Sequence, residues 1–185
     1  MIGEEFASVL ARAQGGDEAA FACLWLDVNQ ALVRYLRVVS GELEEEDVAA
    51  ETWVTIVRGL GRFRGDEMAW RAWVFTTARR RAIDEGRRRT RGRTALASQV
   101  AELADRGKPV PPDPAQVVLE RLDTEAALAL VAQLAPLQAE VIMLRVIAGL
   151  DVQAVARLVG RRPGAVRWPL IVGCGGLRRS WTSRV

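Results

Sequence analysis

Residues 44–89 read EEEDVAAETWVTIVRGLGRFRGDEMAWRAWVFTTARRRAIDEGRRR, and this stretch decides the fold class. Its apolar side chains recur every three or four positions, a spacing that brings them to one face of an α-helix. The pattern predicts two helices, from about Glu44 to Leu60 and from about Glu67 to Arg88, separated by a glycine-rich break. The stripe of the first helix comprises Val48, Thr52, Ile56 and Leu60. The second helix is expected to bury Trp70, Trp73, Val74, Thr77 and Ala78.

A longer amphipathic helix is predicted upstream of this stretch. Asp17 is its expected N-cap, and Ser40-Gly41 closes it. Its apolar face comprises Phe21, Leu24, Trp25, Val28, Leu32, Tyr35, Leu36 and Val39. Together with a short N-terminal helix, these elements predict a compact helical domain that ends near residue 90.

The composition of the sequence changes between Thr90 and Asp113, where Pro109, Pro111 and Pro112 fall within four residues. This composition predicts a flexible linker. Helical periodicity returns at residues 117–134 and 137–148.

A helix-turn-helix pattern follows. Gly149-Leu150-Asp151 closes one helix and caps the next, Gly160 ends that helix, and Pro163 suits the first turn of another. No stretch carries a strand pattern. The predicted fold is therefore all-α, with two small helical domains (residues 1–90 and 117–185) joined by a flexible linker (residues 91–116).

Composition limits the possible functions. The 185 residues include no histidine and only two cysteines, Cys23 and Cys174. The commonest general base and metal ligand is therefore missing, and we expect no metal site, no cofactor and no catalytic residue. No apolar stretch reaches the length of about 18 residues that a membrane span needs, and the acidic N-terminus is unlike a signal peptide. We expect a cytoplasmic protein without membrane insertion.

Charge is distributed unevenly along the chain. Residues 42–51 hold six acidic and no basic side chains, whereas residues 79–93 hold eight arginines. These two patches suggest two different partners, one of them a polyanion. Trp70 and Trp73 lie beside the basic patch, where indole rings could stack on unpaired bases. The alternative is that both tryptophans are core residues at helical spacing.

Two segments resemble the extracytoplasmic-function (ECF) sigma factors of bacterial RNA polymerase. Residues 44–89 are similar to the second conserved region of that family. Residues 134–167, LAPLQAEVIMLRVIAGLDVQAVARLVGRRPGAVR, are similar to the first part of its fourth region. The resemblance covers about residues 5–89 and 117–167 and includes the order of the regions and the linker between them. It implies a sigma factor that binds core polymerase and directs promoter recognition and opening.

The resemblance also implies roles for particular residues. The segment that docks on the clamp coiled coil of core polymerase corresponds to Asp47, Val48, Glu51, Thr52 and Trp53, with Ala50 in place of the usual glutamine. The loop that captures a base flipped from the minus-ten element corresponds to residues 63–70, including Arg64, Gly65, Asp66 and Trp70. The helix at the upstream edge of that element contributes Arg71, Trp73, Arg79, Arg80, Asp84, Arg87 and Arg88. In the helix-turn-helix, the expected DNA-binding residues are Arg161, Arg162, Gly164 and Arg167.

Residues 168–185 depart from the family pattern. Where a basic recognition helix is expected, the chain has Pro169 and three glycines within residues 173–176. An internal proline costs a helix about 3 kcal/mol and each glycine about 1 kcal/mol, so we expect a broken helix and poor recognition of the minus-thirty-five element. Two explanations of this tail are open, a frameshift and a genuine divergence. Back-translation with GC-rich codons gives V-A-A-H-R-G-L-R-R in a neighbouring frame.

Three partners are expected for a sigma factor of this kind: core RNA polymerase, promoter DNA and an anti-sigma factor. One alternative is a helix-turn-helix regulator that binds DNA without polymerase. Another is a sigma factor with an impaired second domain, which would only titrate its protein partners. An enzyme is the weakest alternative, because Asp66 and Glu67 have no third group that would make them catalytic.

Overall fold

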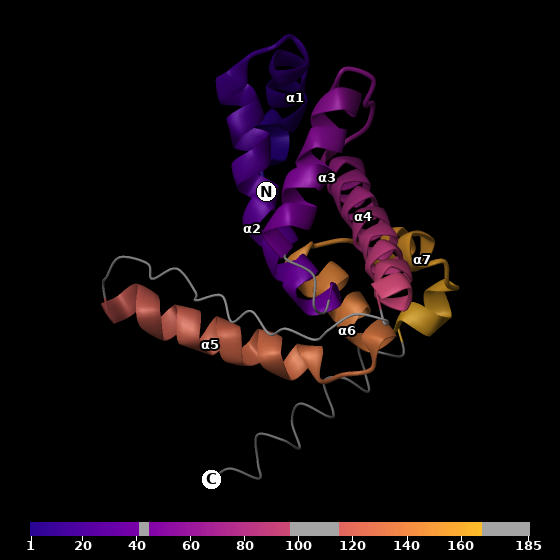
Figure 1. The fold of residues 1–185 in the computed structure, drawn as a ribbon. Helices are drawn as coiled ribbons and strands as arrows, with labels where there is room; N and C mark the ends of the chain where they lie inside the picture. Colours follow the sequence, from indigo (N-terminus) through magenta and orange to yellow (C-terminus); the bar gives the residue numbers. More distant parts are fainter. Residues whose placement is uncertain (41–44, 97–114, 168–185) are drawn as a thin grey trace.

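The computed structural model describes residues 1–40, 45–96 and 115–167, and for residues 92–96 and 115–123 it describes the backbone alone (Figure 1). Every element in these ranges is helical, which confirms the predicted class. The elements are η1 (Gly3–Glu5), α1 (Phe6–Gln14), α2 (Glu18–Val39), α3 (Glu45–Leu60), α4 (Glu67–Leu96), α5 (Ala115–Ala132), α6 (Pro136–Ile142), the π-helical η2 (Met143–Ile147), α7 (Val152–Val159) and a last turn at 163–167. None of these described helices is both long and apolar enough to cross a bilayer.

Acidic side chains cap three helices, α2, α4 and α7, by accepting a backbone amide that the helix itself cannot satisfy. The Asp17 carboxylate accepts the Ala20 amide at 3.0 Å, and Asp151 accepts the Ala154 amide at 2.7 Å. Both predicted caps are thus confirmed. The Ala20 hydrogen bond, aided by Arg12, lowers the pKa of Asp17 below its usual value.

The first four α-helices pack into one body, which we call the N-terminal body (residues 1–40 and 45–96; Figure 1). The predicted stripe of α3 faces its core, since Val48, Thr52, Ile56 and Leu60 are all buried. The largest buried side chains here are Trp70, Tyr35, Phe75, Leu24, Leu32 and Leu36. Burial of each such side chain contributes about 1.5–3 kcal/mol, so this core dominates the stability of the body.

The C-terminal body (residues 115–167) packs directly against the N-terminal one. Helix α2 contacts α5, α6 and η2, while α4 contacts α7. Figure 1 shows the orange and yellow helices gathered at one end of α2 and α4. The chain therefore folds back on itself, and the described parts of the two bodies form one closed arrangement.

Several details differ from the sequence expectation, and one of them is Trp73, which we expected to be buried and which is only half-buried. Trp25 lies at the edge of the apolar face of α2 and remains 37% exposed, although we expected it in the core. Helix α4 continues to Leu96 rather than ending near Arg88. Arginine is a good helix former, and Glu85 pairs with both Arg88 and Arg89 one turn on, so the helix is locally supported. Most of the predicted linker (97–114) and the atypical tail (168–185) lie outside the described residues.

Candidate functional site

An aromatic cluster joins the loop after α3 to the start of α4. Phe63 stacks on Trp73 with ring centroids 5.1 Å apart and planes at 9°, and Trp70 meets both rings edge-on. Trp70 is fully buried, whereas Trp73 is only half-buried. In this conformation Trp70 is therefore a core residue. Trp73 is the tryptophan of the pair that retains an accessible face.

The conformation of the loop between α3 and α4 is fixed by hydrogen bonds and by a glycine. The Arg64 guanidinium donates to the carbonyl oxygens of Gly61 and Phe63, at 3.1 and 2.6 Å. Gly65 has φ +155°, and a Cβ there would lie 2.7 Å from the Cβ of Ala69, so glycine is required at this turn. Asp66 is exposed and accepts the Ala69 amide at 2.8 Å, which makes it the N-cap of α4. Arg64 and Asp66 are thus placed on the surface of an ordered loop.

The middle of α4 presents arginines to two different sides. Arg81 faces α3, where it donates to the Thr55 hydroxyl at 2.8 Å and lies 3.7 Å from Glu51. Arg79 faces α6, where it pairs with Glu140 at 2.6 Å. This hydrogen bond raises the pKa of Arg79 above its usual value. The exposed predicted DNA contacts on α4 are Arg80, Asp84, Arg87 and Arg88.

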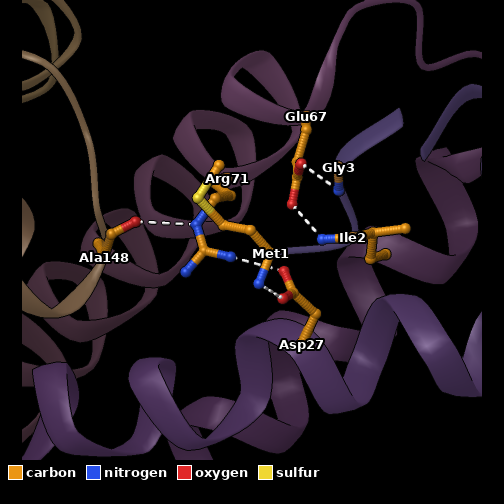
Figure 2. A network of polar contacts seen from close by, with 7 residues as sticks. All are labelled: Met1, Ile2, Gly3, Asp27, Glu67, Arg71 and Ala148. Carbon is orange, nitrogen blue, oxygen red and sulfur yellow. Dashed lines mark hydrogen bonds and ion pairs between the residues drawn. The ribbon is translucent and has the colours of Figure 1, made fainter. Parts of the chain in front are cut away.

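Arg71 occupies an interior network (Figure 2). Its side chain is only 7% exposed, and it donates to the Asp27 carboxylate at 2.5 Å and to the Ala148 carbonyl at 2.9 Å. The Met1 nitrogen lies 2.5 Å from the second Asp27 oxygen, and Glu67 accepts the amides of Ile2 and Gly3. The structure therefore places this predicted DNA contact inside the protein, where it links both bodies.

The predicted polymerase-docking residues on α3 fall into a buried group and an exposed group. Asp47 and Glu51 are exposed, while Val48, Thr52 and Trp53 are buried. The Trp53 indole donates to the Asn29 side-chain oxygen at 2.8 Å, which fixes α3 on α2. The exposed acidic pair is flanked on the same helix by Ala50, Val54 and Val57, which are also exposed. This surface combines negative charge with apolar area.

The helix-turn-helix region consists of α7 and the turn at 163–167. Gly160 ends α7 in the left-handed conformation at φ +67°, as a C-terminal glycine commonly does. Arg161, Arg162, Gly164 and Arg167 are all exposed, while Val166 is buried. Four predicted DNA contacts thus share one accessible end of the C-terminal body.

Comparison with known proteins identifies the family. The sigma-70 region 2 model matches residues 26–92, which include α3 and most of α4. The ECF RNA polymerase sigma factor SigD of Mycobacterium tuberculosis is 30% identical over 174 residues, which cover 90% of this chain and 79% of SigD. This chain belongs to the ECF RNA polymerase sigma factors.

Two further proteins resemble this ECF sigma factor, one in sequence and one in fold. The ECF sigma factor BldN of Streptomyces coelicolor is 32% identical over 157 residues, and the chain spans 58% of its length. The sigma factor RpoE of Bartonella quintana, solved in complex with the anti-sigma factor NepR, is 22% identical with a TM-score of 0.65. That match covers 89% of this chain and 98% of RpoE. The likeness to RpoE shows a shared fold.

Sequence reasoning missed three residues that organise the site. Asp27 holds Arg71, Glu140 holds Arg79, and Tyr35 donates to Glu140 at 3.0 Å. Burial, together with the nearby Glu140 charge, raises the pKa of Tyr35 well above its usual value. In the sequence, Tyr35 is only one member of the apolar stripe of its helix. No spacing signal relates it to a glutamate 105 positions away.

Proposed function

We propose that this ECF sigma factor docks on core RNA polymerase through the exposed surface of α3 and opens promoter DNA with the loop at 61–66 and the exposed side of α4. The observation that supports this docking surface is that α3 has one buried side and one exposed side. Val48, Thr52 and Trp53 hold α3 in place, while Asp47 and Glu51 are exposed to a partner, and Glu51 also lies 3.7 Å from Arg81. Exposed charge of one sign beside apolar area suits a specific protein interface, because complementary charges on the partner select it and steer its approach.

Promoter opening requires groups that bind phosphates and groups that hold unpaired bases. The exposed arginines of α4 suit the first task, because guanidinium groups bind phosphate oxygens bidentately. The half-buried Trp73 and the ordered loop around Arg64 suit the second. We assign Trp70 to the support of that loop, since it packs beneath Phe63 and Trp73. The chain itself makes and breaks no bond in this proposal, because polymerase performs the chemistry.

The remaining partners follow from the fold and the family. The exposed arginines at 161, 162 and 167 would contact duplex DNA at the minus-thirty-five element. An anti-sigma factor is the proposed regulator, in line with the complex of RpoE and NepR.

Binding of the purified chain to core RNA polymerase tests the docking surface. The Asp47→Arg, Glu51→Arg double variant should weaken binding at least tenfold, because both side chains are exposed and their reversal opposes the partner's charge. The matched control is Glu4→Arg, Glu5→Arg, which makes the same charge change at another exposed site. Wild-type affinity in the α3 variant, with circular dichroism showing an intact fold, would overturn the assignment.

A DNA regulator that acts without polymerase is the competing function. It predicts that the wild-type chain binds a duplex but not core polymerase, and that the α3 variant behaves like the wild type in every assay. The same binding experiment therefore separates the two functions.

A further inference from the structure

Helix α1 reaches the start of the loop at 61–66 through one side chain. Gln14, the last residue of α1, is half-buried, and its amide nitrogen donates to the carbonyl oxygens of Leu60 and Phe63, both at 2.9 Å. A glutamine amide carries two hydrogens, so one side chain can bridge both acceptors. Gln14 therefore ties the end of α1 to the turn that leads from α3 into the loop.

The same N-terminal segment also holds the other end of the loop. Glu67, the first residue of α4, is 8% exposed, and its carboxylate accepts the backbone amides of Ile2 and Gly3 at 2.7 and 3.0 Å (Figure 2). In Figure 1 the turn from α1 to α2 and the loop from α3 to α4 lie at the same end of the molecule. Residues 2–14 thus form a brace that contacts the chain on both sides of the loop.

The Phe63 carbonyl is the point at which this brace meets the groups on the loop. It accepts the Arg64 guanidinium at 2.6 Å in addition to the Gln14 amide, so both of its lone pairs are used. The Phe63 ring lies flat on Trp73 and also borders the turn at Gly65, where a Cβ would lie 3.2 Å from Cζ of the ring. Rotation of this peptide group would therefore move the Phe63 ring and the Arg64 guanidinium together.

Selection of an unpaired base depends on position more strictly than attraction of the DNA backbone does. Hydrogen bonds and ring stacking need defined distances and angles, and a recognition site must hold its groups within about 0.5 Å of the productive geometry. Coulomb attraction between arginines and phosphates falls only gradually with distance. A loosened loop would therefore lose its preference for one base before α4 lost its affinity for DNA.

We propose that Gln14 is a positioning residue for base selection, because its bridge to the Leu60 and Phe63 carbonyls fixes the loop in the conformation that accepts one unpaired base of the promoter. The inference rests on the proposed function of the loop. Gln14 acts through the loop backbone and does not touch the base. Its loss changes which bases are accepted and leaves the attraction of DNA in place.

Two variants remove the bridge and keep the length of the side chain. Gln14→Met has the same helix propensity but no donor, and Gln14→Glu presents only acceptors to the two carbonyl oxygens. The Leu60 and Phe63 carbonyls keep their other donors, the Phe63 amide and Arg64, so we expect unfolding midpoints close to that of the wild type. The matched control is Gln30→Met, an exposed glutamine on α2.

Hydrogen exchange of the full chain, followed by mass spectrometry, reports whether the bridge holds the loop. The Phe63 amide donates to the Leu60 carbonyl at 3.0 Å, so it exchanges only when this turn opens. Peptides that contain residues 59–66 should exchange about threefold faster or more in both Gln14 variants, as expected when a hydrogen bond that resists opening is lost. Gln30→Met should match the wild type. Unchanged exchange of these peptides in Gln14→Met would overturn the proposal.

The second measurement is the base preference of the holoenzyme formed by the full chain and core RNA polymerase. The probe is a pool of single-stranded DNA with about six random central nucleotides, a length within the usual site size for single strands. The bound fraction is sequenced, and the ratio of the most to the least enriched base is taken at each position. An Arg64→Gln variant, which changes an exposed group of the loop, identifies the position that the loop reads.

Both Gln14 variants should lower the ratio at that position about fivefold or more, which corresponds to the net contribution of one hydrogen bond. Their total affinity for the pool should stay within about twofold of the wild type, because the arginines of α4 still attract phosphates. Gln30→Met should change neither quantity. An equal fall in affinity and in preference would mean general damage to the chain and would overturn the positioning role.

The same experiment separates this inference from the function on which it rests. If the wild-type holoenzyme has no base preference, or if Arg64→Gln alters none, the loop does not read a base and both the proposed function of the loop and the role of Gln14 fail. If Arg64→Gln removes a preference that Gln14→Met retains, the function of the loop stands and the role of Gln14 fails.

Discussion

Arg71 lies on the helix that carries the predicted DNA contacts, yet its side chain has a structural role in this conformation. Its guanidinium satisfies the Asp27 carboxylate and the Ala148 carbonyl, and the whole group is shielded from solvent. A buried charge without its partner is strongly destabilising, because the lost hydration is not repaid. The contact from Arg71 to Ala148 also ties α4 to the loop that follows η2.

We expect Arg71→Met to lower the free energy of unfolding by about 3 kcal/mol, because the largely buried Asp27 carboxylate would lose its guanidinium and keep only the Met1 amino group as a charged partner. The Arg71→Met, Asp27→Leu double variant should recover part of that loss, since no buried carboxylate remains without its guanidinium. Urea unfolding of the wild type, both single variants and the double variant gives the coupling energy. A negligible loss in Arg71→Met would mean that Arg71 is available to DNA instead.

At the scale of the elements, α4 packs tightly against α3 at Gly59. A Cβ at this position would lie 2.8 Å from Cζ2 of Trp73, a ring that is itself stacked on Phe63. Helix propensity favours alanine over glycine by about 1 kcal/mol, but overpacking costs about 1–3 kcal/mol. The steric cost is therefore expected to exceed the gain in propensity.

We predict that Gly59→Ala lowers the free energy of unfolding by about 1 kcal/mol. The matched control is Gly86→Ala within α4, where a Cβ meets nothing within 4 Å, and we expect stabilisation by about 1 kcal/mol from helix propensity alone. Urea denaturation of both variants measures the difference. Equal stabilisation of the two would show that the Phe63–Trp73 stack has room to shift.

Hydrogen bonds also connect the loop between α3 and α4 to α1. The Gln14 side-chain amide on α1 donates to the Leu60 and Phe63 carbonyls, both at 2.9 Å. Helix α1 thus positions the loop that the proposed function assigns to the flipped base. Several helices therefore build the site, although most of its residues lie in one continuous segment of the sequence.

At the scale of the whole molecule, the interface between the two bodies should respond to alkaline pH through Tyr35. Its pKa is raised in the folded chain by burial and by Glu140, whereas in the unfolded chain it returns to about 10. Above that pH the unfolded state loses the proton while the folded state retains it. The stability that Tyr35 contributes is therefore fully present below about pH 10 and declines as the pH rises further.

We predict that the wild-type chain loses stability relative to Tyr35→Phe between about pH 9 and pH 11, with a limiting slope of about 1.4 kcal/mol per pH unit. Urea unfolding of both proteins across this pH range measures the difference in their free energies of unfolding. Other groups that titrate in this range affect both proteins equally, so their contributions cancel. Parallel pH profiles would contradict the assigned environment of Tyr35.

Local interactions explain what the sequence analysis predicted correctly. The bounds of α2 and α3, the caps Asp17 and Asp151 and the buried stripe of α3 depend on neighbours within about four residues. Such contacts recur with the helical period, so the linear pattern already contains them. The family followed from the same stretch, because residues 44–89 carry both the helical pattern and its exposed acidic and basic groups.

Contacts between distant residues were decided by the tertiary structure alone. Arg79 meets Glu140 across 61 positions, and Arg71 meets Ala148 across 77. Spacing along a helix shows which residues share a face, but it does not show which other element covers that face. Trp70 and Trp73 illustrate the limit, since only the packing of Phe63 and Trp53 determines which indole is buried. The sequence by itself thus determined the helices and the family, whereas tertiary packing decided which of the predicted functional side chains are accessible.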